Sequence, residues 1–290
     1  MTPQFETVQL TSSCSYYLVS YVDLLGQGAP LQAIADRRPN EAEELAKVFG
    51  PVVTHIRFLR DAFFIFAKAM AAGPVPDGLP AEHFERFRRF RKVDAGIRTF
   101  SDSLVLTSKL EESDEFGRWG PIYSIQTHLN GLATILVMGL ASKIPIRVGT
   151  SLSIGMELDG EYLGPALGEA YDLERKIADY PRVVVHQRVR RVLISHAQRH
   201  DPEAPEPAID AAAARIAGEM ASVLRPISPT ADMLDVIHPL FTAAGGAFSV
   251  QNLADARAFA FDQHAEHQAT GDTKLATRYA QLLSYFNGAA

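Results

Sequence analysis

Two aspartates, Asp23 and Asp102, are the residues of this chain whose types and surroundings could do chemistry together. Asp23 follows an apolar stretch, and Asp102 lies between two serines. Two carboxylates about 5 Å apart repel by roughly 3 kcal/mol at an effective dielectric constant of 20, and a bound cation removes that repulsion. Mg²⁺ prefers carboxylates that leave open positions for substrate phosphates. Together, Asp23 and Asp102 predict a divalent-cation site, although an aspartate after a strand is often only a turn former.

The two aspartates can meet only if the segments around them form neighbouring strands. Residues 16–22 are β-branched and aromatic, which is typical of a buried strand. Residues 96–100 and 104–108 flank a short polar interruption and predict a hairpin with Asp102 at its tip. Adjacent central strands would then place Asp23 beside that tip.

The rest of the chain alternates helical and strand patterns. Helices are expected at about 30–70, 121–140 and 165–178, strands at 145–155 and 182–185, and mostly helix from about 187 onward. The order β-α-ββ-α-β-α-β predicts an α+β fold, with an antiparallel sheet and helices on one face. We expect a single domain over 1–290, with a core at about 12–190 and a C-terminal helical extension at about 191–290.

Composition excludes several classes of protein. With 290 residues, 47% of them apolar and 21% charged, the chain is neither disordered nor fibrous. One cysteine, Cys14, excludes an intramolecular disulfide and a Cys-rich zinc module. The net charge of −6 argues against non-specific nucleic-acid binding, which needs a basic face. The start lacks a signal-peptide pattern, and the longest apolar run, within 132–141, is too short for a bilayer. We expect a cytoplasmic protein that binds neither nucleic acid nor membrane.

Four motifs in sequence order resemble those of class III nucleotidyl cyclases. The first is the strand, Asp and Leu-Leu-Gly of residues 21–26, and the second is Asp102 in its hairpin. The third is the Arg- and Gly-containing strand at 145–155, and the fourth is the turn and helix at 160–173, which resemble the dimer arm. The resemblance implies a ferredoxin-like core that dimerises head to tail, with active sites at the dimer interface. The C-terminal helices have no counterpart in the minimal domain of that family.

The same resemblance implies a reaction. Asp23, Asp102 and the backbone carbonyl of Leu24 would hold two divalent cations, Mg²⁺ or Mn²⁺, which bind the triphosphate of a nucleotide. The 3′-hydroxyl attacks the α-phosphorus and pyrophosphate leaves, while positioning and charge neutralisation supply most of the catalysis. The backbone N–H groups of Leu25 and Gly26 would cradle phosphate.

Base recognition and the dimer-arm helix depart from the family pattern. Arg98 stands where the family has a base-reading Lys, and Glu161 stands where it usually has Asp or Thr. A guanidinium is larger than an ammonium and forked, which favours a smaller base. Gly168 and Asp172 replace the Asn that orients the ribose and the Arg that braces the transition state. Arg175 could substitute for that Arg, or pair with Asp172.

These departures exclude an ordinary adenylyl or guanylyl cyclase. The chain most resembles the Pycsar anti-phage pyrimidine cyclases, which keep the metal pair and reshape the base pocket. The resemblance implies a homodimeric uridylate cyclase that converts UTP, in preference to CTP, to the 3′,5′-cyclic monophosphate and pyrophosphate. Its product would act on a separate effector protein. Two alternatives stay open: a divergent adenylyl or guanylyl cyclase, and an inactive cyclase-like domain that binds a nucleotide or a partner.

Overall fold

The structure is a computed structural model, and it describes residues 14–27, 31–32, 42–73, 75, 79–90, 95–110, 119–158, 161–199, 207–242 and 248–288. Most of the predicted start of the first helix and the predicted turn at 159–160 lie outside these residues.

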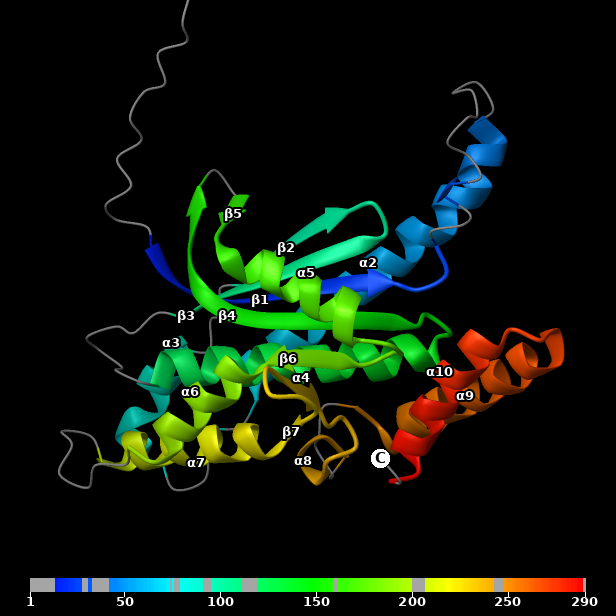
Figure 1. Cartoon of the computed structure of the whole chain (residues 1–290). Coiled ribbons are helices and arrows are strands. Elements are labelled where there is room, and N and C mark those ends of the chain that lie inside the picture. Colours follow the sequence, from blue (N-terminus) through cyan, green and yellow to red (C-terminus); the bar gives the residue numbers. More distant parts are fainter. Residues whose placement is uncertain are drawn as a thin grey trace, which may run out of the picture.

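An eight-stranded, mostly antiparallel sheet forms the centre of the molecule (Figure 1). Its path is β2-β3-β1-β4-β6-β8-β7, with β5 paired to β4. The strands are β1 (Cys14–Leu24), β2 (Ala95–Phe100), β3 (Ser103–Leu110), β4 (Ile146–Leu158), β5 (Glu161–Leu163), β6 (Val183–His186), β7 (Leu224–Pro226) and β8 (Ala231–Leu234). Among the described strands, β6 alone runs parallel to a neighbour, which is β4. The first four strands have the order of a ferredoxin-like sheet, which confirms the predicted α+β class.

Alternation along β1 separates the two faces of the sheet. Leu18 and Val22 point into the main core, whereas Tyr17 and Val19 point to the opposite face. Helices α2 (Ala42–Ala72) and α4 (Trp119–Ala141) contribute to the main core, as predicted for one face.

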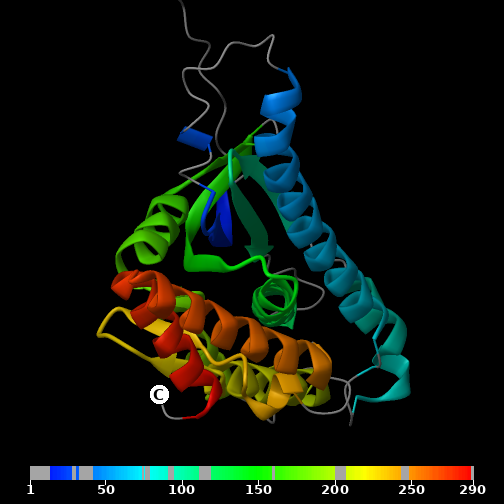
Figure 2. The same ribbon diagram turned by 90° about the vertical axis from the view of Figure 1, so that its right-hand side faces the viewer.

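Helix α5 (Pro165–Ile177) is an exception to that prediction, because it packs on the other face against β1, β4 and β6. Figure 2 shows α5 and α2 on the two sides of the sheet.

The C-terminal part of the chain packs around α4, which is buried along most of its length. Its helices are α6 (Gln187–Ala197), α7 (Pro207–Ser222), α8 (Pro239–Thr242), α9 (Val250–Thr270) and α10 (Thr273–Phe286), and two short helices, η1 (Ala81–His83) and α3 (Phe84–Phe90), precede β2. The sequence predicted a mostly helical remainder, but β7 and β8 form a hairpin that extends the sheet beyond β6. In the described part of the chain, no helix has the length and apolarity of a membrane span.

A buried polar cluster fixes the central strands to α4. His128 of α4 is fully buried, with Nε2 2.7 Å from Ser20 Oγ and Nδ1 2.8 Å from Ser108 Oγ. Ser20 Oγ also lies 2.8 Å from Thr150 Oγ1 of β4. Burial lowers the pKa of His128 to about 3, so the ring is neutral. Because a register shift would break these bonds, the cluster specifies how β1, β3 and β4 align.

Candidate functional site

The structure brings Asp23 and Asp102 together at one end of the sheet. Asp23 pairs with Ser103 in the β1–β3 register, and the Leu24 N–H donates to the Asp102 carbonyl at 3.2 Å. Burial raises the pKa of Asp23, and the charge of Asp102 raises it further, whereas Arg147 opposes the rise. The tight turn formed by Ser101 and Asp102 places Ser101 in the left-handed region, with φ of 53°. Two partly buried carboxylates therefore share one site.

A backbone hydrogen bond and a left-handed glycine fix the turn that follows β1. Leu25 donates its N–H to the Pro145 carbonyl at 3.0 Å, and Gly26 has φ of +85°. A left-handed residue here explains the glycine in the first motif. Because the Leu25 N–H is engaged with Pro145, it is not free for the phosphate cradle predicted from the sequence.

An ion-pair network that the sequence did not predict surrounds Asp23. Arg147 Nη2 on β4 lies 3.1 Å from Asp23 Oδ2 and 2.6 Å from Glu174 Oε1 on α5. Burial raises the pKa of Glu174 to about 7; Arg147 opposes the rise and Asp23 adds to it. Arg147 is part of the third sequence motif, but only the packing of α5 on the sheet reveals its partner Glu174.

A glycine allows α5 to approach this closely. A Cβ atom at Gly149 would lie 2.0 Å from the Ala170 carbonyl oxygen and 2.6 Å from the Glu174 backbone nitrogen. Both atoms are backbone, so a larger residue would push α5 off the sheet. The glycine therefore positions Glu174 beside Arg147.

The donors at the aspartate pair are suitable for a hard divalent cation. They are the two carboxylates and the predicted backbone carbonyl of Leu24, all of them oxygens, as Mg²⁺ and Mn²⁺ prefer. Among the residues that the structure describes, no cluster of three His, Cys, Asp or Glu side chains could hold a metal alone. The remaining ligands would have to come from substrate phosphates or water. Asp23 accepts one hydrogen bond from Arg147 at Oδ2, and a carboxylate has lone pairs for further partners.

Arg98 and Glu161, the two residues expected to read the base, come close to each other, and a third residue joins them. Arg98 Nε lies 4.0 Å from Glu161 Oε2, and Arg98 Nη2 lies 3.0 Å from Glu157 Oε1. The Arg98 side chain is 16% exposed, and Glu157 also accepts from Thr107. Sequence motifs gave no signal for Glu157, because it reaches Arg98 across the curved end of β4.

Within one chain, Arg98 and Glu161 lie apart from the aspartate pair. Arg98 lies on β2, four residues before Asp102 in the β2–β3 turn. At the rise of an extended strand, the Cα atoms of Arg98 and Asp102 are up to about 13 Å apart. Arg98 also points toward Glu157, at the end of β4 opposite to Arg147.

The two positions on α5 that were compared with the cyclase dimer arm, Gly168 and Asp172, carry neither Asn nor Arg. Gly168 is exposed, and a Cβ atom there would meet nothing within 4 Å. Asp172 pairs with Lys176 at 2.9 Å and not with Arg175, which was one of the two alternatives for Arg175. Arg175 instead reaches the Tyr171 hydroxyl at 3.4 Å. Neither side chain is directed to the aspartate pair by these contacts.

No protein-family model and no curated protein matches the chain. Among solved structures, it is similar to an adenylate/guanylate cyclase/hydrolase from Silicibacter pomeroyi, with 13% identity and a TM-score of 0.35 over 62% of this chain and 80% of that chain. It is also similar to the dimeric guanylyl cyclase domain of the RhoGC fusion protein from Blastocladiella emersonii, with 12% identity and a TM-score of 0.34 over 60% of this chain and 80% of that chain.

Proposed function

We propose that this chain is a metal-dependent nucleotide cyclase whose reaction takes place at Asp23 and Asp102. The observation that carries the proposal is the meeting of these two carboxylates, in which the charge of one raises the pKa of the other. Structural carboxylates are usually separated or paired with cations, because like charges at short distance destabilise the fold. Here the guanidinium of Arg147 contacts both Asp23 and Glu174.

Each residue of the site would have a defined task. The 3′-oxygen of the nucleotide attacks the α-phosphorus, the bond to the β-phosphate oxygen breaks, pyrophosphate leaves, and the 3′-hydroxyl proton passes to water. Bound divalent cations would acidify that hydroxyl and neutralise the phosphates. Asp23, Asp102 and the Leu24 carbonyl would hold them, and Arg147 fixes the rotamer of Asp23. Gly26 would let the turn approach the phosphates.

We further propose a pyrimidine substrate, UTP in preference to CTP. Arg98 is a forked donor held in place by Glu157, and the 4-carbonyl of uracil is an acceptor, whereas cytosine presents an amino donor there. A guanidinium also occupies more of the pocket than the family's Lys, which leaves less room for a purine. A role in anti-phage signalling through a separate effector follows from the resemblance to the Pycsar cyclases.

We also propose a homodimer with its active sites at the interface. Within one chain, the base-reading residues Arg98 and Glu161 lie away from Asp23 and Asp102. In a head-to-tail dimer, the aspartates of one protomer would face Arg98 of its partner, so a complete site needs both chains. Two exposed apolar side chains, Ile154 on β4 and Leu163 on β5, are suited to such a contact.

The test is to incubate the protein with ATP, GTP, CTP and UTP separately, with Mn²⁺, and to detect cyclic monophosphates by mass spectrometry. Asp102→Ala should abolish product formation, whereas Asp172→Ala, on the exposed side of α5, should not. Cyclic UMP or cyclic CMP that disappears in Asp102→Ala supports the proposal. A purine product would indicate a divergent adenylyl or guanylyl cyclase, and activity that survives in Asp102→Ala would refute the metal site.

A second candidate function is a cyclase-like domain that binds a nucleotide without turnover. Gly168 and the Lys176-paired Asp172 favour it, because neither can orient a ribose or stabilise the transition state. Nucleotide binding without any cyclic product, from all four nucleotides, would support this candidate.

A further inference from the structure

A cavity of about 480 Å³ lies between the turn after β1 and the helical hairpin formed by α9 and α10. Four separate segments line it: the turn after β1, the loop before β4, Pro181 before β6, and the hairpin. Figures 1 and 2 show the hairpin next to the end of the sheet where β1 ends and β4 begins. The lining includes Gly26, Lys143, Gln263, His267, Arg278 and Tyr279.

The cavity is lined by residues that directly follow the aspartate site in the chain, Leu25 and Gly26. Gly26 is three residues after Asp23, so their Cα atoms are at most about 10 Å apart. The Leu25 N–H bond to the Pro145 carbonyl ties the turn to the loop that carries Lys143. A nucleotide whose α-phosphate lay at Asp23 would therefore extend its other phosphates along Gly26 toward the cavity.

Positive charge enters the cavity from two different elements. Lys143 comes from the loop between α4 and β4, and Arg278 comes from α10. No carboxylate is among the described residues that line the cavity. Glu266, exposed on α9, accepts a hydrogen bond from the Gln263 amide at 2.8 Å and lies outside the lining. Two cations without a lining carboxylate give the cavity the charge that a polyphosphate needs.

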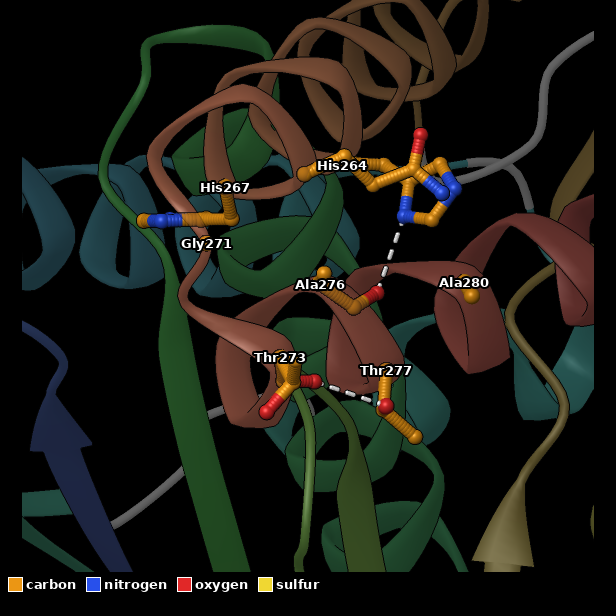
Figure 3. A pocket seen from close by; sticks show the side chains of 8 residues that line it. His264, His267, Gly271, Thr273, Ala276, Thr277 and Ala280 are labelled. Atoms are coloured by element: carbon orange, nitrogen blue, oxygen red, sulfur yellow. Dashed lines mark hydrogen bonds between the residues drawn. The ribbon is translucent and has the colours of Figure 1, made fainter.

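The hairpin holds Arg278 on a rigid support. Figure 3 shows His264 of α9, whose Nδ1 lies 2.9 Å from the Ala276 carbonyl oxygen of α10. The His267 ring stacks on Tyr279 of α10, with centroids 5.7 Å apart. Asp272 caps the start of α10 by accepting from the Leu275 N–H. Because these contacts fix α10 on α9, the cation has a defined position before any ligand arrives.

We propose that this cavity, the phosphate pocket, binds the β- and γ-phosphates of the nucleoside triphosphate and retains them as pyrophosphate after cyclisation. The proposal rests on the proposed function of the aspartate site. Lys143 and Arg278, from two different elements, neutralise the phosphates through charge-assisted hydrogen bonds. The resemblance to class III cyclases leads one to expect an arginine at the position of Asp172 on α5. The C-terminal hairpin supplies a different cation, Arg278.

The test measures binding of inorganic tripolyphosphate, with Mn²⁺, to the full chain by isothermal titration calorimetry. Arg278→Gln should weaken binding about tenfold or more, the size expected when a charged hydrogen bond is lost. Lys143→Asn should also weaken it, and Asn tolerates the left-handed backbone of that position, where φ is 62°. Arg257→Gln, which removes an exposed arginine from α9 outside the lining, is the matched control and should leave binding unchanged. Thermal unfolding by circular dichroism shows whether each variant is folded.

The outcomes separate this inference from the proposed function. If the protein cyclises a nucleotide but Arg278→Gln and Lys143→Asn bind tripolyphosphate like wild type, the phosphate pocket is wrong and the reaction stands. If no nucleotide is cyclised but both variants lose tripolyphosphate binding, the pocket stands and the reaction is wrong. Failure of the wild-type protein to bind tripolyphosphate overturns the pocket.

Discussion

Replacing Asp102 with Asn should change the stability of the fold in opposite directions with and without a divalent cation. Without a cation, the change removes a negative charge whose proximity raises the pKa of Asp23. Carboxylates about 5 Å apart repel by about 1 kcal/mol at the dielectric constant of water and by about 3 kcal/mol at 20. Asp102 is partly exposed and Arg147 offsets the charge of Asp23, so we expect about 1 kcal/mol of stabilisation, or about 2 °C in Tm.

With a cation, the order of the two proteins should reverse. A ligand that binds the folded state at about 100 times its Kd adds about 2.7 kcal/mol to the free energy of unfolding. Asp102→Asn lacks one of the two carboxylate ligands, so saturating Mn²⁺ should raise its Tm much less than that of the wild type. The assay is thermal unfolding in EDTA and in Mn²⁺, with Asp172→Asn as the control for a lost surface charge. Equal Mn²⁺ stabilisation of wild type and Asp102→Asn, or a lower Tm of the variant in EDTA, would refute the shared-site reasoning.

Two further predictions concern the fold that supports the site. Because the pKa of His128 falls from 6.5 to about 3 on folding, its stability contribution is complete above pH 6.5 and decreases by about 1.4 kcal/mol per pH unit as the pH falls toward 3. Glu174, whose pKa is raised to about 7, changes the stability in the opposite direction over this range, so the test is the difference between wild type and His128→Gln in urea unfolding at about pH 7.5 and about pH 5.5. On lowering the pH, the change in the wild type should differ from that in the variant by about 1.4 kcal/mol toward lower stability, and equal dependences would show that His128 is not responsible. Gly149→Ala should destabilise by at least about 3 kcal/mol, because its Cβ would meet the Ala170 carbonyl oxygen at 2.0 Å. Gly168→Ala, in open space on α5, should gain up to about 1 kcal/mol from helix propensity, and similar stabilities of the two variants would contradict this packing argument.

Local sequence patterns predicted most of the elements near the site. The apolar and β-branched run before Asp23, and the two short runs around Asp102, predicted strands that the structure places side by side. Periodicity also predicted α4 and α5 to within a few residues at each end. Such signals are local, because side-chain alternation and turn residues act within a few positions along the chain.

Short strands far along the chain were missed for the same reason. The segments Leu224–Pro226 and Ala231–Leu234 are too short to show a clear alternation, and their strand conformation comes from pairing with β6. Their apolar residues are equally compatible with a helix when read alone.

By itself, the sequence determined the α+β class, the two aspartates and the elements that carry them, since these depend on local pattern. Only the tertiary structure decided which partners those residues have. Glu174 reaches Arg147 because α5 packs on the opposite face of the sheet from α4, and Glu157 reaches Arg98 because β4 curves across the sheet. Arg278 lines the same cavity as the turn after Asp23 because α10 packs on α9, and α9 packs on α4. These contacts join residues distant in sequence, and their free energy comes from burying whole elements against one another, which no local pattern encodes.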